Sequence, residues 1–265
     1  MISREMPEES EPLLLVQNLV KSYGSHRAVD TVCYALRPGE LVALLGENGA
    51  GKSTMLQTIV GLLRPDAGTI QISGRTVSPT DSFHKRLIGY LAERPFFYPT
   101  LSGVEFLQFV GALYGLRRRE STVWGQELLK QMHLVDVAHQ RIQSYSQGMR
   151  QRLALCATLL HRPRLLLLDE PLNGLDPIHV RDLKTLLLQL CSEGCAVLVS
   201  THLLDVAERL CSRILILSHG HLIADGSLDQ LRLLARQPDH STLEAVFFAL
   251  TQEQSNLVQM PGGEQ

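Results

Sequence analysis

The segment GENGAGKST at residues 46–54 restricts the fold of this chain more than any other feature. An apolar run over Leu41–Leu45 precedes it, and a helical pattern follows it to Leu63, where Pro65 is expected to stop the helix. Strand, glycine-rich loop and helix in this order let backbone N–H groups converge on an anion at a helix N-terminus. The segment therefore predicts a phosphate-binding loop inside an α/β core.

Residues of this loop have separate roles toward a bound nucleoside triphosphate. Lys52 supplies a positive charge to the terminal phosphates, and the hydroxyl of Ser53 completes the coordination of Mg²⁺. A glycine-rich turn that matches the pattern by chance is the alternative, and the strand before the loop and the helix after it argue against it. The residues predicted to bind the nucleotide here are Gly46, Glu47, Asn48, Gly49, Ala50, Gly51, Lys52, Ser53 and Thr54.

Two acids, Asp169 and Glu170, follow a second apolar strand at Leu165–Leu168. Ligands bind at the carboxyl ends of parallel strands, which is where these acids would lie. Asp169 is predicted to hold Mg²⁺ through its water shell, and Glu170 to polarise the attacking water as a general base. An isolated Asp-Glu pair at a strand end is usually a solvated turn, so the catalytic interpretation depends on the phosphate-binding loop in the same chain.

A third buried strand, Val197–Ser200, leads into Thr201 and His202. A histidine directly after a strand is more often a structural hydrogen bonder than a catalytic group. Because this strand end is expected at the same edge of the sheet as the two acids, His202 is a candidate sensor of the γ-phosphate.

Buried strands alternate with helical segments through the second half of the chain, which indicates a parallel, doubly wound sheet. Residues 13–46 and 66–92 are expected to form strands and turns, and residues 100–161 carry apolar side chains at helical spacing. The predicted fold class is α/β: a P-loop NTPase with a parallel core sheet, an N-terminal antiparallel β subdomain and an inserted helical subdomain at about residues 94–160. After Gly226 we expect a short helix and then an amphipathic segment around Leu243–Leu250.

Composition excludes several classes of protein. A formal net charge of -2 lacks the positive field of a nucleic-acid binder, so nucleic acid is not an expected partner. No apolar run approaches the length of about 20 residues that a membrane-spanning helix needs. The first twelve residues lack the apolar stretch of a secretory signal, and the five scattered cysteines are interpreted as reduced core thiols rather than a zinc site, which favours the cytoplasm.

The motifs resemble, in their order, those of the ATPase subunits of ATP-binding cassette (ABC) transporters. The order is GENGAGKST, YSQGM at residues 145–149, LLLLDEP at 165–171, NGLD at 173–176 and then Thr201-His202. The resemblance covers residues 13–226, an expected ABC ATPase domain, and leaves residues 227–265 as a short helical tail. It is specific, because phosphate-binding loops occur in many unrelated NTPases whereas the Ser-x-Gly element before the second acid motif does not.

The resemblance implies roles for four residues outside the phosphate-binding loop. Tyr23 would stack on adenine; the alternative is a tyrosine that only packs within its turn. His202 would be the switch histidine. Asp176 would be the loop acid that links two sites across a dimer. Glu93 stands where the family usually has glutamine; its carboxylate still offers an oxygen to Mg²⁺ or water, but its charge would alter metal affinity. The catalytic set is then Glu170, His202 and Lys52, and the metal ligands are Ser53, Glu93 and Asp169.

Ser146, Gln147 and Gly148 would form the signature element, which in the family grips the γ-phosphate bound by the opposite subunit. Ser146 suits this role physically, because it is expected to cap a helix at 149–160 whose N-terminus then faces an anion. The element departs from the family pattern, since Gln147 replaces a glycine and Met149 replaces a glutamine. The serine and the later glycine, the parts closest to phosphate, are kept.

In function, the resemblance implies a motor subunit that binds ATP and Mg²⁺, hydrolyses ATP and drives export through a separate integral membrane permease. Two copies, or two different ATPase subunits, would close head to tail around two ATP molecules. The chain would be cytoplasmic and peripheral on the inner face of the cell membrane. Residues 241–251 resemble a closing element of exporter-type ATPases, and the aromatic cluster Pro95–Pro99 would be either core or a surface for a short helix of the permease.

Two other classes of protein stay open at this point. One is a soluble ABC ATPase associated with ribosomes or DNA and not with transport; such proteins usually carry two cassettes or long coiled coils, and one cassette is seen here. The other is an ATP-binding regulator without hydrolysis, and the presence of Lys52, Asp169, Glu170 and His202 argues against it.

Overall fold

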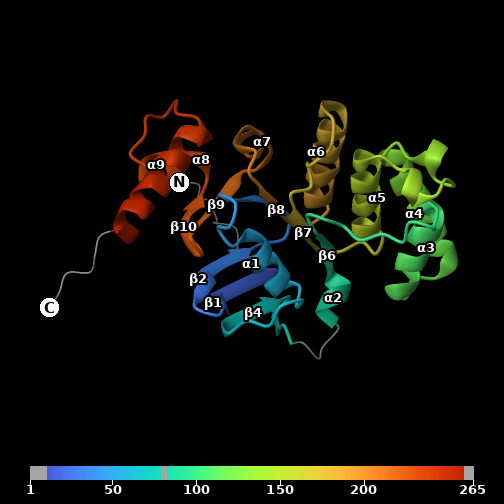
Figure 1. Cartoon of the computed structure of the whole chain (residues 1–265), viewed down its shortest axis with the longest axis horizontal. Coiled ribbons are helices and arrows are strands. Elements are labelled where there is room, and N and C mark those ends of the chain that lie inside the picture. The colour runs from blue at the N-terminus through green and yellow to red at the C-terminus, as the bar shows by residue number, and fades with distance from the viewer. Residues whose placement is uncertain (1–10, 79–82, 260–265) are drawn as a thin grey trace, which may run out of the picture.

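The fold comes from a computed structural model that describes residues 11–78 and 83–259. Residues 1–10 and the last six residues of the predicted tail, 260–265, lie outside these ranges. Within them the chain forms two sheets, one antiparallel and one mainly parallel, with helices around them (Figure 1). The sheets and the helical insert confirm the predicted α/β class.

Strands from the first part of the chain make the antiparallel sheet, in the spatial order β2 (His26–Leu36), β1 (Leu14–Tyr23), β4 (Ala67–Ile72) and β5 (Arg75–Thr76). The second sheet has the order β10 (His221–Gly226), β9 (Arg213–Ser218), β3 (Leu41–Leu45), β8 (Ala196–Thr201), β7 (Leu165–Asp169) and β6 (Ile88–Leu91). Its strands from β9 to β6 are parallel, whereas the edge strand β10 runs antiparallel to β9.

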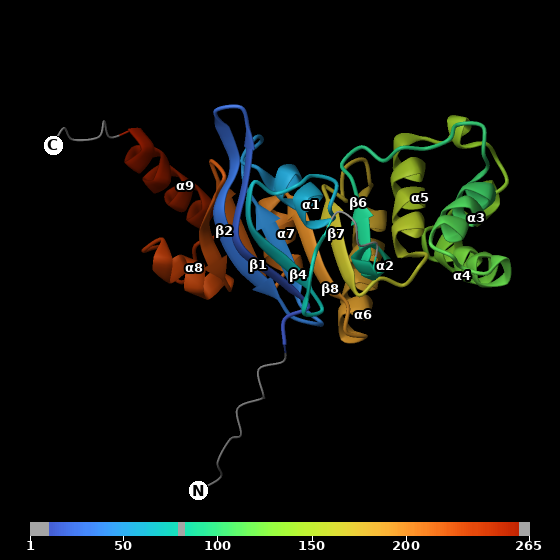
Figure 2. The same ribbon diagram turned by 90° about the horizontal axis from the view of Figure 1, so that it is seen from below.

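Helices cover the parallel sheet and form both ends of the molecule (Figures 1 and 2). Near the sheet lie α1 (Lys52–Ile59), α2 (Phe83–Leu87), α6 (Pro177–Ser192) and α7 (Leu204–Leu210). A helical block at one end contains α3 (Gly103–Leu113), α4 (Arg118–Gln131), the 3₁₀ turns Val135–Val137 and Ile142–Ser144, and α5 (Gln147–Leu159). At the other end lie α8 (Leu228–Leu234) and α9 (Leu243–Gln259). Among the described residues, no helix combines the length and apolar character that crossing a bilayer requires.

Side chains of the parallel strands alternate between opposite faces, as strands that are covered on both faces must. In β3, Val42 and Leu44 pack with α1 and the antiparallel sheet, whereas Ala43 and Leu45 face α7, α8 and α9. In β7, alternate leucines such as Leu166 join the core of the helical block. A fully buried leucine contributes about 1.5–3 kcal/mol, so packing on both faces holds these short strands in place.

Three helices differ from what the sequence pattern predicts. α1 ends at Ile59 rather than Leu63, because Gly61 adopts a left-handed φ of 76° and stops the helix before the proline. Residues 83–87 form the short helix α2 in a region where strands and turns are expected. α5 begins at Gln147, two residues before the predicted start.

The parallel register brings distant segments together at the carboxyl edge of the sheet. Leu45 pairs with Thr201, and Asp169 pairs with Ser200. The loop that begins at Gly46 therefore starts beside the end of β8, and β8 in turn neighbours the acids that end β7. All three predicted motifs meet at one edge, as expected for ligand binding in a parallel sheet.

Candidate active site

Two glycines of the loop after β3 have no room for a side chain. A Cβ atom on Gly51 would lie 2.0 Å from the carbonyl oxygen of Ala28, and one on Gly46 would lie 2.4 Å from that of Leu217. Gly51 also adopts a φ of 107° as the N-cap of α1, a conformation that other residues rarely adopt. The loop is thus pressed against β2 and β9 and leads into the N-terminus of α1, where backbone amides favour an anion.

Lys52 lies inside this loop, with 7% of its surface exposed. Its Nζ donates to the carbonyl oxygen of Gly46 at 2.7 Å and to that of Glu47 at 3.1 Å. Burial lowers the pKa of Lys52, and the charges of nearby carboxylates, Glu170 first among them, oppose that shift. The loop therefore fixes the ammonium group close to the acids of the site.

Ser200 holds the two acids at the end of β7. It is fully buried, and its hydroxyl donates to Oδ1 of Asp169 and accepts from the N–H of Glu170 at 3.3 Å. The Ser200 carbonyl oxygen accepts from the same N–H at 3.1 Å. Glu170 has a left-handed φ of 48°, a strained conformation of the kind that is concentrated at functional sites.

Glu170 and His202 form a pair between the ends of β7 and β8. Nδ1 of His202 lies 3.0 Å from Oε1 of Glu170, and the glutamate side chain is buried while the histidine is about half exposed. The other carboxylate oxygen, Oε2, is buried and has no hydrogen-bond partner within the described ranges. A buried oxygen without a partner is costly, so this atom marks a place where a water or a bound group is readily accepted. Such a pair can orient a carboxylate as a general base.

These groups line a cavity of about 580 Å³ at the carboxyl edge of the sheet. Half of the Tyr23 surface is exposed, so its ring is available for stacking. The cavity brings most of the predicted nucleotide-binding and catalytic residues together. Its lining consists of Tyr23, His26, Ala28, Glu47, Asn48, Gly49, Gly51, Lys52, Ser53, Thr54, Glu93, Asp169, Glu170, Asn173 and His202.

The cavity wall differs in part from the set predicted from the sequence. Gly46 and Ala50 do not line it: the Gly46 carbonyl holds Lys52, and the Ala50 N–H donates within the loop to Glu47 at 3.1 Å. His26, Ala28 and Asn173 line the cavity and Ser200 supports it, and all four were missed; Ala28 stands in no motif. Asn173 opens the NGLD motif and Ser200 directly precedes Thr201-His202, so both carried a signal, whereas His26 carried none.

The signature residues Ser146, Gln147 and Gly148 lie outside this cavity. The hydroxyl of Ser146 accepts from the N–H of Met149 at 3.2 Å, which confirms the predicted N-cap. A Cβ atom on Gly148 would lie 2.8 Å from the carbonyl oxygen of Gly174, so the start of α5 packs directly on the loop at residues 171–176. In a single chain the signature and the phosphate-binding loop therefore do not share a cavity.

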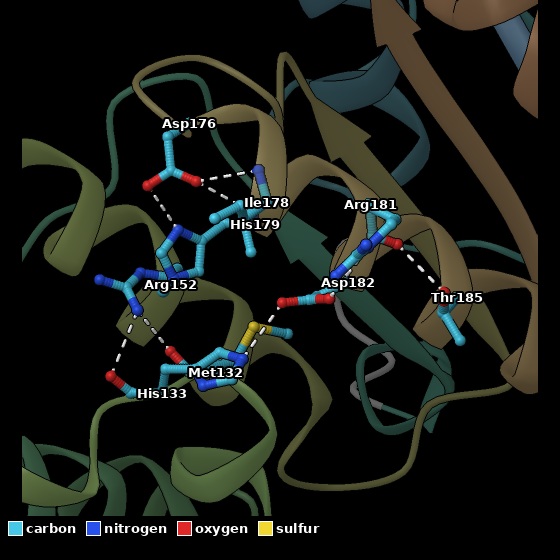
Figure 3. A network of polar contacts seen from close by, with 9 residues as sticks. All are labelled: Met132, His133, Arg152, Asp176, Ile178, His179, Arg181, Asp182 and Thr185. Carbon is cyan, nitrogen blue, oxygen red and sulfur yellow. Dashed lines mark hydrogen bonds and ion pairs between the residues drawn. The ribbon is translucent and has the colours of Figure 1, made fainter.

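Asp176 also lies outside the cavity, at the end of the loop 171–176, where it caps α6 (Figure 3). Its Oδ1 accepts from the N–H groups of Ile178 at 3.1 Å and His179 at 3.0 Å, and Oδ2 lies 2.8 Å from Nδ1 of His179. Hydrogen bonds from the His179 backbone and side chain hold the pKa of Asp176 below its usual value.

The donors of the cavity suit a magnesium ion that is shared with phosphate oxygens. The Ser53 hydroxyl and the carboxylates of Asp169 and Glu93 all line it, and Mg²⁺ usually combines one or two carboxylates with substrate phosphates. In the described part of the chain, no cluster of three or more His, Cys, Asp and Glu side chains could hold a metal by itself.

Comparisons with known proteins agree with this geometry. A family model described as ABC transporter matches residues 29–173. The uncharacterized ABC transporter ATP-binding protein YxlF of Bacillus subtilis is 42% identical over 220 residues, which cover 83% of this chain and 72% of that protein. The linearmycin resistance ATP-binding protein LnrL of the same organism is 36% identical over 83% of this chain and 70% of its own length.

Solved structures give the same result. A structure of the ATP binding subunit of an ABC transporter has a TM-score of 0.85 and 33% identity, and the match covers 90% of this chain and 99% of the other. A dimeric structure of the bacterial ABC transporter cassette MJ0796 has a TM-score of 0.75 and 27% identity, covering 81% of this chain and 98% of the other. The chain therefore belongs to the ABC transporter family, as one of its ATP-binding subunits, which are ATPases.

Proposed function

We propose that this chain is the motor subunit of an ABC exporter and that Glu170 is its general base. The observation that carries the catalytic assignment is the pair between Glu170 and His202 in the same cavity as Lys52. One carboxylate oxygen is held by the histidine, and the other is buried without a partner among the described residues. Such a carboxylate is oriented and has one acceptor position left for the attacking water.

ATP binding is assigned to the loop and the tyrosine. The amides at residues 46–54 and the ammonium of Lys52 bind the phosphates, and the ring of Tyr23 stacks on adenine. Ser53, Asp169 and Glu93 hold Mg²⁺, which neutralises charge on the phosphate oxygens when it is bound. Glu47, Asn48, Gly49 and Thr54 also line the cavity and complete this binding set.

Hydrolysis is assigned to the acids at the ends of the strands. Oε2 of Glu170 accepts a proton from the water that attacks the γ-phosphorus, while the bond from this phosphorus to the β,γ-bridging oxygen breaks and ADP leaves. The bond to His202 keeps the carboxylate in place. His202 is about half exposed, and it contacts the γ-phosphate from the same edge. Ser200 keeps Asp169 and the Glu170 backbone in register.

A second ATPase subunit completes each site. Ser146, Gln147 and Gly148 lie outside the cavity of their own chain, and Ser146 caps a helix whose N-terminus suits an anion. We therefore assign them to the γ-phosphate bound by the opposite subunit, with Asp176 between the two sites. The dimeric cassette among the similar structures supports this arrangement.

The membrane partner is assigned to an exposed aromatic surface that follows Glu93 in the chain. Phe96 is 77% exposed, and its ring lies edge-on to Tyr98 at 5.4 Å, which in turn lies edge-on to Phe109 at 5.3 Å. Exposed aromatic side chains grouped in this way favour a short helix of a permease. The chain would then be cytoplasmic, peripheral on the inner face of the membrane. The segment at 241–251 and the name of the linearmycin resistance protein support export as the direction.

Replacement of the general base tests the catalytic assignment. Glu170→Gln keeps the size and the hydrogen bond to His202 but removes the proton acceptor, so we expect ATP binding without turnover and a stable ATP-bound dimer. The measurements are ATP binding by calorimetry, phosphate release, and the oligomeric state by light scattering. Substantial phosphate release by purified Glu170→Gln protein would refute the assignment of the base.

Co-purification tests the transport assignment against an ATPase that acts on ribosomes or DNA. We expect the protein to co-purify from a detergent extract with an integral membrane protein. The variant Phe96→Ala should lose that partner while keeping its ATP affinity. Recovery with ribosomes or DNA and never with a membrane protein would contradict the transport assignment.

A further inference from the structure

A network of polar contacts joins α6 to the helical block (Figure 3). His179 on α6 pairs through Nδ1 with Oδ2 of Asp176 at 2.8 Å. His133, in the turn after α4, pairs through Nε2 with Oδ2 of Asp182 on α6 at 3.1 Å. The two imidazole rings lie edge to face, with centroids 5.6 Å apart. Two histidine–carboxylate pairs thus meet where the helical block contacts α6.

Arg152 extends this network to α5. Its Nη1 donates to the carbonyl oxygen of Met132 at 2.7 Å and to that of His133 at 3.3 Å. A charged donor on a backbone carbonyl makes a stronger hydrogen bond than a neutral one, so α5 and the turn after α4 are held together. His133 then connects this turn to Asp182 on α6.

The loop at residues 171–176 is held along its whole length by the same elements. At its start, the buried side chain of Gln151 on α5 donates to the carbonyl oxygen of Pro171 at 3.1 Å. In its middle, Gly174 packs against Gly148. At its end, Asp176 is bonded by His179. This loop follows the Glu170 base directly, and Asn173 within it lines the nucleotide cavity, so its position affects both the base and the start of α5.

We infer that His179 is a positioning residue for ATP hydrolysis and that it acts through Asp176, with His133 as the second positioning residue that fixes α6 against the helical block. Without the histidine pairs, Asp176 keeps its backbone bonds to Ile178 and His179 but loses its side-chain partner, and α6 loses its link to His133. The position of Glu170 relative to the N-terminus of α5 is then no longer fixed. The inference rests on the proposed function, in which Glu170 is the base and α5 serves the opposite subunit.

Crossed asparagine and glutamine substitutions test this geometry. The amide nitrogen of asparagine replaces Nδ1 of histidine, and that of glutamine replaces Nε2. Because His179 uses Nδ1 and His133 uses Nε2, we expect His179→Asn and His133→Gln to keep the turnover rate. One side-chain hydrogen bond corresponds to about five-fold in rate, so His179→Gln and His133→Asn should lower kcat by about that factor. KM for ATP should stay within about two-fold in all four variants, because the nucleotide contacts are unchanged.

The variant Asp176→Asn provides a second test that does not depend on replacing a histidine. Asparagine caps helices about as well as aspartate, so the Tm should fall only by the roughly 2–4 °C that one lost side-chain hydrogen bond costs, whereas the carboxylate acceptor for His179 is lost and kcat should fall by about five-fold. His240→Ala, an exposed histidine outside the network, is the control. Equal rates for asparagine and glutamine at both positions, or an unchanged rate for Asp176→Asn, would overturn the inference. Turnover by Glu170→Gln would instead overturn the proposed base, so the two failures are distinguishable.

Discussion

Ser200 is the residue whose replacement should separate positioning of the metal ligand from catalysis itself. Its hydroxyl is the buried link between β8 and the acids of β7, since it donates to Asp169 and accepts from the N–H of Glu170. Ser200→Ala removes one oxygen atom and leaves the strand packing intact. Asp169 then loses a charged hydrogen bond, whereas the Glu170 N–H keeps its bond to the Ser200 carbonyl oxygen at 3.1 Å.

The expected magnitude follows from the charge of the acceptor. A hydrogen bond to a charged group contributes about 1.5–3 kcal/mol, and a domain of this size loses about 2–4 °C of Tm for each kcal/mol, which gives a Tm about 3–12 °C lower. Loss of a residue that orients a metal ligand typically lowers metal affinity by about 10-fold to 100-fold. We therefore expect the Mg²⁺ concentration for half-maximal ATPase activity to rise by at least about 10-fold in Ser200→Ala.

A Mg²⁺ titration of the ATPase rate, with differential scanning calorimetry, is the assay. Ser218→Ala is the matched control, because Ser218 is also a buried serine at the end of a parallel strand, yet its hydroxyl contacts His219 at 3.0 Å and no site acid. An unchanged Mg²⁺ requirement in Ser200→Ala would refute the claim that Ser200 positions Asp169, whatever its Tm.

Three further predictions concern the loop, the signature helix and the thiols. Gly51→Ala should lower the free energy of unfolding by more than about 3 kcal/mol and abolish ATP binding, because its Cβ would clash with the Ala28 carbonyl. Gly49→Ala is the control: its φ is also strained, but no atom lies within 4 Å of its Cβ, so chemical denaturation should show a smaller loss. Ser146→Ala should lower stability by about 1 kcal/mol through the lost N-cap, and an unchanged midpoint of unfolding would contradict that role. Iodoacetamide at pH 8 should label exposed Cys33 in the folded protein and spare the other cysteines until the protein unfolds. The reason is that burial raises the pKa of Cys195 and of Cys211 to about 12, and the reactive thiolate forms only as the pH approaches that value. Mass spectrometry of the native protein that finds another labelled thiol would contradict the burial.

The sequence predicts those parts of the site that depend on contiguous residues. The phosphate-binding loop needs glycines, a lysine and a hydroxyl in one short segment, and the structure gathers them at the N-terminus of α1. Asp169 and Glu170 were predictable because a fully apolar strand ends in two acids. The parallel sheet followed from strands that are apolar at every position, since a strand covered on both faces has no polar side.

The remaining parts depend on register, which no local pattern contains. Ser200 supports Asp169 because β7 and β8 pair with these two residues opposite each other, and a slip of one residue would turn its hydroxyl to the other face. The early end of α1 depends on the left-handed backbone of Gly61, while the sequence pattern favours the proline as the stop. The contact between Gly148 and Gly174 depends on how the helical block sits against the loop, so no local pattern predicts that the two glycines meet.

The charge of the cavity supports the proposal that a second subunit completes the site. Its wall carries four carboxylates, from Glu47, Glu93, Asp169 and Glu170, against the single ammonium of Lys52. A nucleoside triphosphate adds further negative charge, so binding is favoured by positive charge beyond that of Lys52 and the N-terminus of α1, because like charges oppose one another more strongly in a partly desolvated site. Under the proposed function, Mg²⁺ would supply part of that charge, and the N-terminus of α5 from a second subunit would supply part of the rest. If both are needed, ATP must raise the affinity of one subunit for the other, and by reciprocity a second subunit must raise the affinity for ATP by the same factor.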